Sequence, residues 1–211
     1  MESPLKKQIQ AVLASDYRGP RAAYGEVDVL KALFAIGNSP SSMGRFRLGQ
    51  VTGLGQGEVR TLISRLKEAG LITVDSKGCA LTEKGKKKFD SISRVIPHSS
   101  SVEAGDLNLG KNAWSVIVRN KGSKVRKGLE QRDASIRAGA TGALTVIYTL
   151  GKFRIPSEKG PSDCEALGPS EPWTTIRKNF KPKRGDVVIV SGADSSSLAE
   201  EGALAVALTV L

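Results

Sequence analysis

The sequence contains few of the residues that build metal sites, disulfide frameworks or catalytic triads. Its 211 residues include two cysteines and one histidine. These three side chains cannot form a Cys/His zinc cluster or a disulfide framework, and a Ser-His-Asp triad would have to use His98. No run reaches the roughly 18–20 apolar residues of a membrane span, and the N-terminus lacks the apolar core of a signal peptide. We therefore expect a cytoplasmic protein with no cofactor, no metal and no membrane contact.

Acidic residues are also scarce relative to basic ones. The chain has 32 Lys and Arg against 21 Asp and Glu, a formal net charge of +11. Before residue 98 the counts are 16 basic and 9 acidic, and from there on 16 and 12. A basic excess that is denser in the N-terminal part favours a polyanionic partner such as nucleic acid.

A stretch without apolar periodicity divides the chain. Residues 91–112 combine a proline, three consecutive serines and glycines, which is typical of a linker. We expect four parts, in chain order: an N-terminal extension (1–23), a first domain (24–96), a linker (97–111) and a second domain (112–211).

The first domain shows a recognisable order of elements. Apolar spacing predicts helices over 26–36, 45–52, 56–69 and 82–93, with a hairpin over 71–81 between the last two. This order is that of a winged helix-turn-helix. The run VRTLISRLKEAGLITVD, followed by a short hairpin and LTEKGKKKF, resembles the recognition helix, wing and closing helix of bacterial and archaeal winged-helix regulators. The resemblance covers about residues 24–94 and implies DNA binding.

Helix geometry selects the side chains that would contact DNA. At about 100° per residue, the face opposite Val59 is polar, and the N-terminal half of a recognition helix faces the base edges. We expect base contacts from Gln56, Arg60, Thr61 and Ser64. We expect phosphate contacts from Arg45, Arg47, Arg65 and Lys77, with Gly57 permitting close approach of the backbone. The alternative is a protein-binding wing with a solvated basic face. The closing helix carries a lysine cluster that either contacts phosphates or forms a solvated surface, at residues 84, 86, 87 and 88.

The second domain is predicted to be a small α/β sandwich of the order β-α-β-β-β-α. Strands are expected over 112–119, 142–150, 152–155 and 186–190, and helices over 123–138 and after Ser197, where a capping box begins. The proline-rich stretch 156–184 is too long for an ordinary connection, so a lid, an ordered surface loop or disorder are the options. The last helix is apolar on nearly every side, which predicts burial against the sheet or in a dimer interface.

Two features of the second domain are candidate ligand sites: the turn SGADSSS, and the run EQRDASIRAGATGA, whose Glu130, Arg132 and Asp133 place mixed charges near the end of two buried strands. The turn SGADSSS follows a strand and precedes a helix, where backbone N–H groups can hold an anion and ligands of open α/β sheets collect. We expect an anionic or hydroxyl-rich metabolite to contact six residues: Arg132, Asp133, Ser191, Gly192, Asp194 and Ser195. Ordinary helix capping and surface ion pairs are the alternative interpretation.

A second resemblance covers most of the chain. The run GLEQRDASIRAGATGA from Gly128 to Ala143, with the ending GALAVALTVL, resembles a family of archaeal winged-helix proteins whose second domain has no known function. The resemblance implies an archaeal transcription regulator, without a ligand or an activity.

These observations lead to one expectation and two alternatives. We expect an α+β protein whose winged helix-turn-helix reads double-stranded DNA as a homodimer, with a C-terminal domain that dimerises and senses a metabolite. One alternative is a non-catalytic interaction module in transcription or RNA metabolism. The other is an enzyme targeted to DNA by its wing, although the sequence offers no nucleophile or histidine base for it. We expect no catalytic residue.

Overall fold

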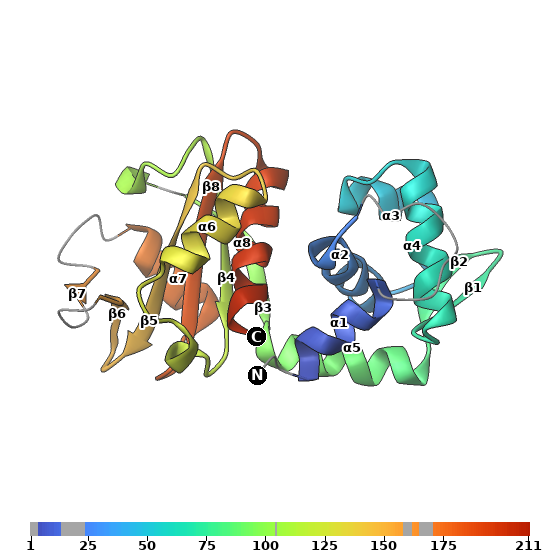
Figure 1. Ribbon diagram of the computed structural model, residues 1–211, viewed down its shortest axis with the longest axis horizontal. Helices are drawn as coiled ribbons and strands as arrows, with labels where there is room; N and C mark the ends of the chain where they lie inside the picture. The colour runs from blue at the N-terminus through green and yellow to red at the C-terminus, as the bar shows by residue number, and fades with distance from the viewer. Residues whose placement is uncertain (1–3, 14–23, 104, 158–161, 165–170) are drawn as a thin grey trace. The chain divides into compact units, whose positions relative to one another are not determined.

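The chain forms two compact units, Met1–Ile92 and Ser93–Leu211 (Figure 1). The structure is a computed structural model that describes residues 4–13, 24–103, 105–157, 162–164 and 171–211. It shows an α+β protein with an N-terminal helical part and a C-terminal antiparallel sheet. No helix in the described ranges is long and apolar enough to cross a membrane.

The N-terminal unit contains the predicted helices and hairpin, each within two residues of the expected bounds. Its elements are α1 (Pro4–Leu13), α2 (Glu26–Gly37), α3 (Arg45–Thr52), α4 (Gln56–Glu68), β1 (Ile72–Asp75), β2 (Gly78–Leu81) and α5 (Glu83–Val95). The expected extension over residues 1–23 is partly wrong, because α1 packs its Ile9 and Val12 side chains into the core. Residues 1–3 and 14–23 of that extension lie outside the described residues.

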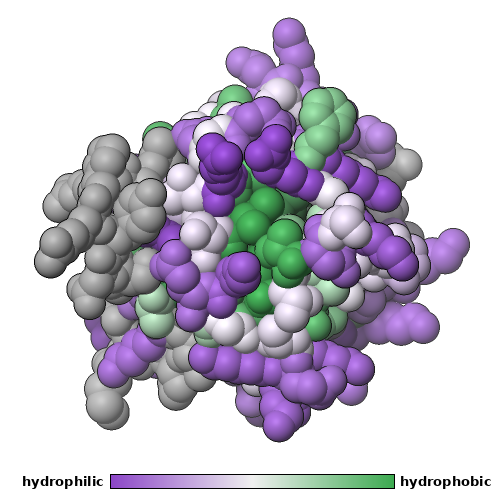
Figure 2. All heavy atoms as spheres, turned by 90° about the vertical axis from the view of Figure 1, so that its right-hand side faces the viewer, coloured by the Kyte–Doolittle hydropathy of each residue, from purple (hydrophilic) through white to green (hydrophobic). Residues whose placement is uncertain are grey.

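The core of this unit is formed by one face of each of its helices. Leu30 and Leu33 of α2, Leu48 of α3, and Leu62 and Leu66 of α4 are fully buried. Figure 2 views the unit from the side on which α4 and the hairpin lie, and it shows polar side chains surrounding an apolar hollow.

The hairpin is tied to the residue that precedes α3. Met43 N–H donates to the Cys79 carbonyl at 2.8 Å, and Cys79 N–H donates to the Met43 carbonyl at 2.9 Å. Gly78 has a φ of +129°, and a Cβ there would lie 2.5 Å from the Met43 oxygen, so only glycine fits beside this bridge. The bridge therefore holds the hairpin beside the start of α3.

The C-terminal unit is built on a six-stranded sheet over its described residues. Its strands are β3 (His98–Val102), β4 (Asn112–Val118), β5 (Gly142–Thr149), β6 (Lys152–Ile155), β7 (Ser162–Asp163) and β8 (Val187–Ala193). They lie in the order β3-β4-β8-β5-β6-β7, and every neighbouring pair is antiparallel. Strand β8 is central and buried along its whole length, with Ile189 opposite Val116 on one side and Thr145 on the other.

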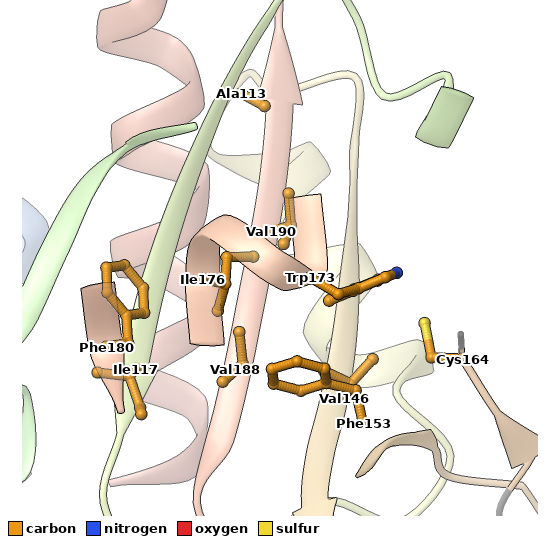
Figure 3. Packing of buried hydrophobic residues seen from close by; sticks show 10 residues of the cluster. All are labelled: Ala113, Ile117, Val146, Phe153, Cys164, Trp173, Ile176, Phe180, Val188 and Val190. Carbon is orange, nitrogen blue, oxygen red and sulfur yellow. The ribbon is translucent and has the colours of Figure 1, made fainter. Parts of the chain in front are cut away.

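Helices cover both faces of this sheet. Helices α6 (Leu129–Arg137) and α8 (Ser196–Val210) pack against one face, and α7 (Glu171–Phe180) lies on the other (Figures 1 and 3). Figure 3 shows Trp173, Ile176 and Phe180 of α7 pointing toward side chains of the strands. Short 3-10 turns at Gly105–Leu107 and Gly122–Lys124 connect the remaining elements.

The expected linker over residues 97–111 is wrong, because it contains β3. Serines occupy three of its five positions, and Ser99 Oγ accepts a hydrogen bond from Trp114 Nε1 at 2.6 Å. An edge strand pairs through its backbone, so β3 needs no apolar periodicity. The second unit accordingly begins at Ser93, and its order is β-β-α-β-β-β-α-β-α rather than β-α-β-β-β-α.

The expected helix over 123–138 is also too long. Helix α6 begins only at Leu129, after Gly128 with a φ of +78°. The helix turns Leu129 and Ile136 outward and buries Ala134 and Ser135 instead. A Cβ at Gly202 of α8 would collide with the hydroxyls of Ser135 and Ser191, so small residues face one another where α6, α8 and β8 meet.

The described part of the stretch 156–184 contains β7 and α7, and Trp173, Ile176 and Phe180 of α7 are buried in the core. Residues 158–161 and 165–170 of this stretch lie outside the described residues. The last helix, α8, begins at Ser196 with Ser195 as its N-cap, two residues before the expected cap at Ser197. Its apolar side chains are buried, and the helix packs on β4, β8 and α6. Of the two expected alternatives, burial against the sheet and burial in a dimer interface, the packing of α8 on the sheet accounts for its buried side chains.

A buried carboxylate holds the end of α7 against the sheet. Asp186 accepts hydrogen bonds from the guanidinium of Arg119 at 2.6 Å and from the backbone N–H groups of Asn120 at 2.9 Å and Lys183 at 2.7 Å. The same guanidinium donates at 3.1 Å to the carbonyl of Phe180, which is the last residue of α7. One ion pair thus joins three chain segments.

Replacing Asp186 with alanine is expected to lower the free energy of unfolding by about 3–5 kcal/mol, because the Arg119 guanidinium and two N–H groups lose their acceptor. The exposed pair between Lys152 Nζ and Asp163 Oδ2, also 2.6 Å apart, provides the control. Lys152→Ala is expected to cost less than about 1 kcal/mol, since water screens an exposed pair. Urea denaturation of both variants measures the difference, and equal losses would contradict the role of Asp186.

Candidate nucleic-acid interface

The N-terminal half of α4 presents polar side chains to solvent. Its first turn is stabilised by the Gly55 N–H, which donates to Glu58 Oε2 at 2.8 Å. Gln56, Gly57 and Arg60 are exposed, and no atom lies within 4 Å of the position that a Cβ at Gly57 would take. The surface around Gly57 is therefore open to a close approach by a ligand.

Helix α3 places two exposed arginines beside α4. Arg45 and Arg47 are exposed, while Leu48, Gly49 and Thr52 form the buried side of the helix. The Gln56 amide nitrogen would lie 3.2 Å from a Cβ at Gly49, so the Gln56 side chain reaches across to α3. The exposed surfaces of the two helices are therefore adjacent.

Phe46 contradicts the expected packing of α3. The apolar residues of the run 45–52 are Phe46, Leu48 and Val51, which predicts that they face the core, but Phe46 is 68% exposed and Val51 is 42% exposed. The spacing carries a signal for this outcome, since residues 46 and 48 are separated by about 200° around a helix and cannot both face one core. The surface beside Arg45 and Arg47 therefore contains an exposed aromatic ring.

The tip of the hairpin carries an exposed lysine. Asp75 Oδ1 accepts hydrogen bonds from the N–H groups of Lys77 at 2.7 Å and Gly78 at 3.1 Å, so its carboxylate is directed toward the turn. The Lys77 side chain is exposed. Arg45 and Lys77 each lie two residues along the chain from the bridge between Met43 and Cys79, which places the cationic tip and α3 on neighbouring segments.

The hydroxyls of α4 make hydrogen bonds within the helix. Thr61 Oγ1 donates to the Gly57 carbonyl at 3.1 Å, and Ser64 Oγ donates to Glu68 Oε1 at 3.0 Å. Both residues are half-buried. Their hydroxyl protons are used in these bonds, and their hydroxyl oxygens retain the capacity to accept a hydrogen bond from a base.

Arg65 is not a surface residue, and its predicted phosphate contact is wrong. Arg65 is 5% exposed, and its Nη1 donates to the Leu13 carbonyl at 2.8 Å. Its guanidinium carbon lies 5.7 Å from the centre of the Tyr24 ring. Burial raises the pKa of the Tyr24 hydroxyl, and the Arg65 charge lowers it in part. The guanidinium thus caps the C-terminus of α1, where a positive charge is favourable.

The predicted ligand site of the second domain does not assemble. Ser191 is completely buried, and its hydroxyl lies 2.9 Å from that of Ser135. Gly192 is buried against the backbone of Leu109, so no ligand reaches it there. Ser195 Oγ caps α8 by accepting from the Leu198 N–H at 3.3 Å, and Asp194 is exposed. These contacts match the capping interpretation of the turn.

Arg132 and Asp133 do not join the buried residues of that turn, although they lie within one helical turn of Ser135, whose hydroxyl contacts that of Ser191. Both are exposed on α6, and the adjacent Gln131 donates through Nε2 to Thr209 Oγ1 at 3.0 Å. Thr209 is separated from Ser196 by about 20 Å of α8. The expected placement at strand ends also required parallel strands, whose carboxyl ends share one edge, whereas this sheet is antiparallel. Among the described residues, no group of three His, Cys, Asp or Glu side chains could hold a metal ion.

Replacing Arg65 with methionine is expected to lower the free energy of unfolding by about 1–3 kcal/mol, since the Leu13 carbonyl loses its donor. Amide hydrogen exchange in α1 is expected to accelerate. Arg60→Met, on the exposed side of the same helix, is the matched control and should change stability by less than about 0.5 kcal/mol. Thermal denaturation with hydrogen exchange measures both effects, and unchanged exchange in α1 would contradict the proposed cap.

Comparison with known proteins matches the second unit to a family model and most of the chain to a solved structure. No curated protein matches the chain. The structure is similar to that of the hypothetical protein PH0730 from Pyrococcus horikoshii OT3, with a TM-score of 0.69 and 25% sequence identity over 89% of this chain and 92% of that chain. Residues 109–210 match the family described as "Domain of unknown function (DUF4443)". This match agrees with the expectation of a second domain of unknown function, over residues 109–210.

Proposed function

We propose that the N-terminal unit is a winged-helix module that binds double-stranded DNA, and that the chain is a transcription regulator. The observation that carries the proposal is the joint exposure of Arg45, Arg47, Gln56, Arg60 and Lys77 on α3, α4 and the hairpin tip. Two carboxylates of α4 are held by hydrogen bonds beside this surface, Glu58 to the Gly55 N–H and Glu68 to the Ser64 hydroxyl, and the four exposed cations outnumber them.

Groove dimensions and helix electrostatics support the same assignment. The major groove of B-DNA is about 12 Å wide and admits one α-helix. The N-terminus of α4 carries the positive end of the helix dipole, and Gly57 leaves its backbone accessible there. In this arrangement Gln56 and Arg60 contact base edges, and Arg45, Arg47 and Lys77 contact phosphates.

A homodimer is part of the proposal. One short helix contacts few base pairs, whereas a two-fold pair reads two half-sites about one helical turn apart. Helix α8 is not the interface, because its apolar side chains are buried within the sheet domain. No position on the second unit is assigned to a metabolite.

An exposed aromatic ring favours a second candidate function. Phe46 and Val51 expose apolar side chains on α3, and an interaction module would use such residues to bind a protein partner. The salt dependence of DNA binding separates the two functions. Phosphate contacts release counterions, so the logarithm of a true DNA affinity falls linearly with the logarithm of salt concentration.

Replacing Arg60 with alanine is expected to weaken binding to the preferred duplex by about 1–3 kcal/mol and to relax discrimination at one base pair, because Arg60 reads a base edge. Replacing Lys77 with alanine should weaken binding to all sequences similarly and reduce the salt slope by about one unit. Fluorescence anisotropy with duplexes selected from random DNA, over a series of salt concentrations, measures both.

Arg132→Ala is the control for these substitutions, since Arg132 is an exposed arginine of the other unit. Its DNA affinity and salt slope should equal those of the wild type. The DNA-binding proposal fails if the wild-type protein shows no salt-dependent affinity for any duplex, and the role of Arg60 fails if its alanine variant discriminates between sequences as the wild type does.

A further inference from the structure

A lysine-lined pocket lies on α5. Lys84, Lys87, Lys88 and Ser91 line a concave space of about 410 Å³. Their spacing of three, four and seven residues places them along one stripe of the helix. A volume of this size falls within the range of roughly 300–1,000 Å³ that is typical of small-molecule sites.

The other sides of α5 carry a different set of residues. Gly85 and Ile92 are buried, and Lys86, Phe89 and Asp90 line a different pocket that also includes the end of α2. None of the described residues that line the lysine pocket is acidic. The stripe therefore concentrates positive charge on one side of the helix.

Contacts within the pocket constrain two of its lysines. Lys84 Nζ donates to the Ala69 carbonyl at 2.7 Å, at the end of α4. Lys88 is half-buried, and its pKa is lowered first by burial and then by the charge of Lys84. Bringing an anion into the pocket would relieve both the lost solvation and the repulsion between the ammonium groups.

The pocket is distinct from the surface proposed to read DNA. Ala69 follows Arg60 by nine residues, a distance of about 14 Å along α4. The lysine stripe therefore lies at the C-terminal end of α4, whereas Gln56 and Arg60 lie in its N-terminal half. A contact between Arg60 and a DNA base edge therefore does not explain why lysines gather in the α5 pocket.

We propose that the α5 pocket binds phosphate groups, with Lys84, Lys87 and Lys88 as charged donors and Ser91 as a neutral donor. Lysine ammonium groups bind phosphate as compact point charges, and three of them match a ligand with several adjacent negative charges. Such a ligand is either a free triphosphate or a run of backbone phosphates in DNA. The first source makes the pocket an effector site, and the second adds a DNA contact to the proposed function.

Calorimetric titration of the full chain with inorganic triphosphate tests the first source. The variant is Lys84→Met with Lys88→Met, which removes two charges and keeps much of each apolar stem. Lys86→Met is the matched control, because it removes one charge from the same helix but from the other pocket. We expect the double variant to bind triphosphate at least about tenfold more weakly than the wild type. The control should stay within about twofold.

Titration of the same proteins with a short mixed-sequence duplex tests the second source. If backbone phosphates occupy the pocket, the double variant loses at least about tenfold in DNA affinity, whereas Lys86→Met keeps its DNA affinity. In that case triphosphate either competes with DNA or fails to bind. If a free triphosphate is the ligand, only the triphosphate arm changes. Thermal denaturation checks that each variant is folded.

The proposal is overturned if the double variant binds both ligands as the wild type does, if the wild type binds neither ligand, or if Lys86→Met loses as much affinity as the double variant. This outcome is independent of Arg60, whose substitution tests the base-reading surface. A wild type that binds triphosphate but no DNA would reject the DNA-binding proposal and leave the pocket assignment standing.

Discussion

Strand β8 is the constraint on which the C-terminal unit depends. It is hydrogen-bonded to β4 on one edge and β5 on the other, and helices cover both of its faces. A strand in this position has no solvent-exposed side, so all seven residues from Val187 to Ala193 are buried. The polar Ser191 is accommodated because its hydroxyl meets that of Ser135. Residues that resemble a ligand-binding turn in sequence are thereby part of the core.

The N-terminal unit depends on a smaller interaction, a pair of backbone hydrogen bonds that fixes the position of the hairpin. The paired hydrogen bonds between Met43 and Cys79 tie the hairpin to the segment that enters α3. Without them, a two-stranded hairpin would be only marginally stable on its own. The bridge keeps Lys77 at a defined distance from Arg45, and the proposed DNA-binding surface relies on that rigidity. Positive charges contribute to recognition only when the backbone holds them in one arrangement.

Basic side chains have three different roles in this unit because their surroundings differ. Arg60 is exposed on α4, Arg65 is buried beneath α1, and the lysines of α5 gather around a concave pocket. Charge counting along the sequence treats these side chains alike. Their chemical behaviour differs because their environments differ in desolvation, in carbonyl acceptors and in neighbouring ammonium groups.

Local periodicity determined much of this protein. The helices of the N-terminal unit, its hairpin, and strands β4, β5, β6 and β8 follow from apolar spacing and glycine positions, because those signals act between residues close in the sequence. Exposure of Gln56 and Arg60 followed from the same geometry. The edge strand β3 left no such signal, because it pairs through its backbone and its side-chain contacts, such as that of Ser99 with Trp114, are made with residues distant in the sequence.

Only the tertiary structure decided which of two equivalent surfaces is covered. Around α4, Arg60 and Arg65 lie on opposite flanks of the apolar face, at about 100° and −120° from Val59. The sequence cannot distinguish these flanks, since the segment that covers one of them, α1, ends 52 residues earlier at Leu13. The strand order that buries Ser191 is likewise set by pairing between segments far apart in the chain. Long-range contacts, which depend on packing rather than on local spacing, therefore determined which predicted site residues remain available to a ligand.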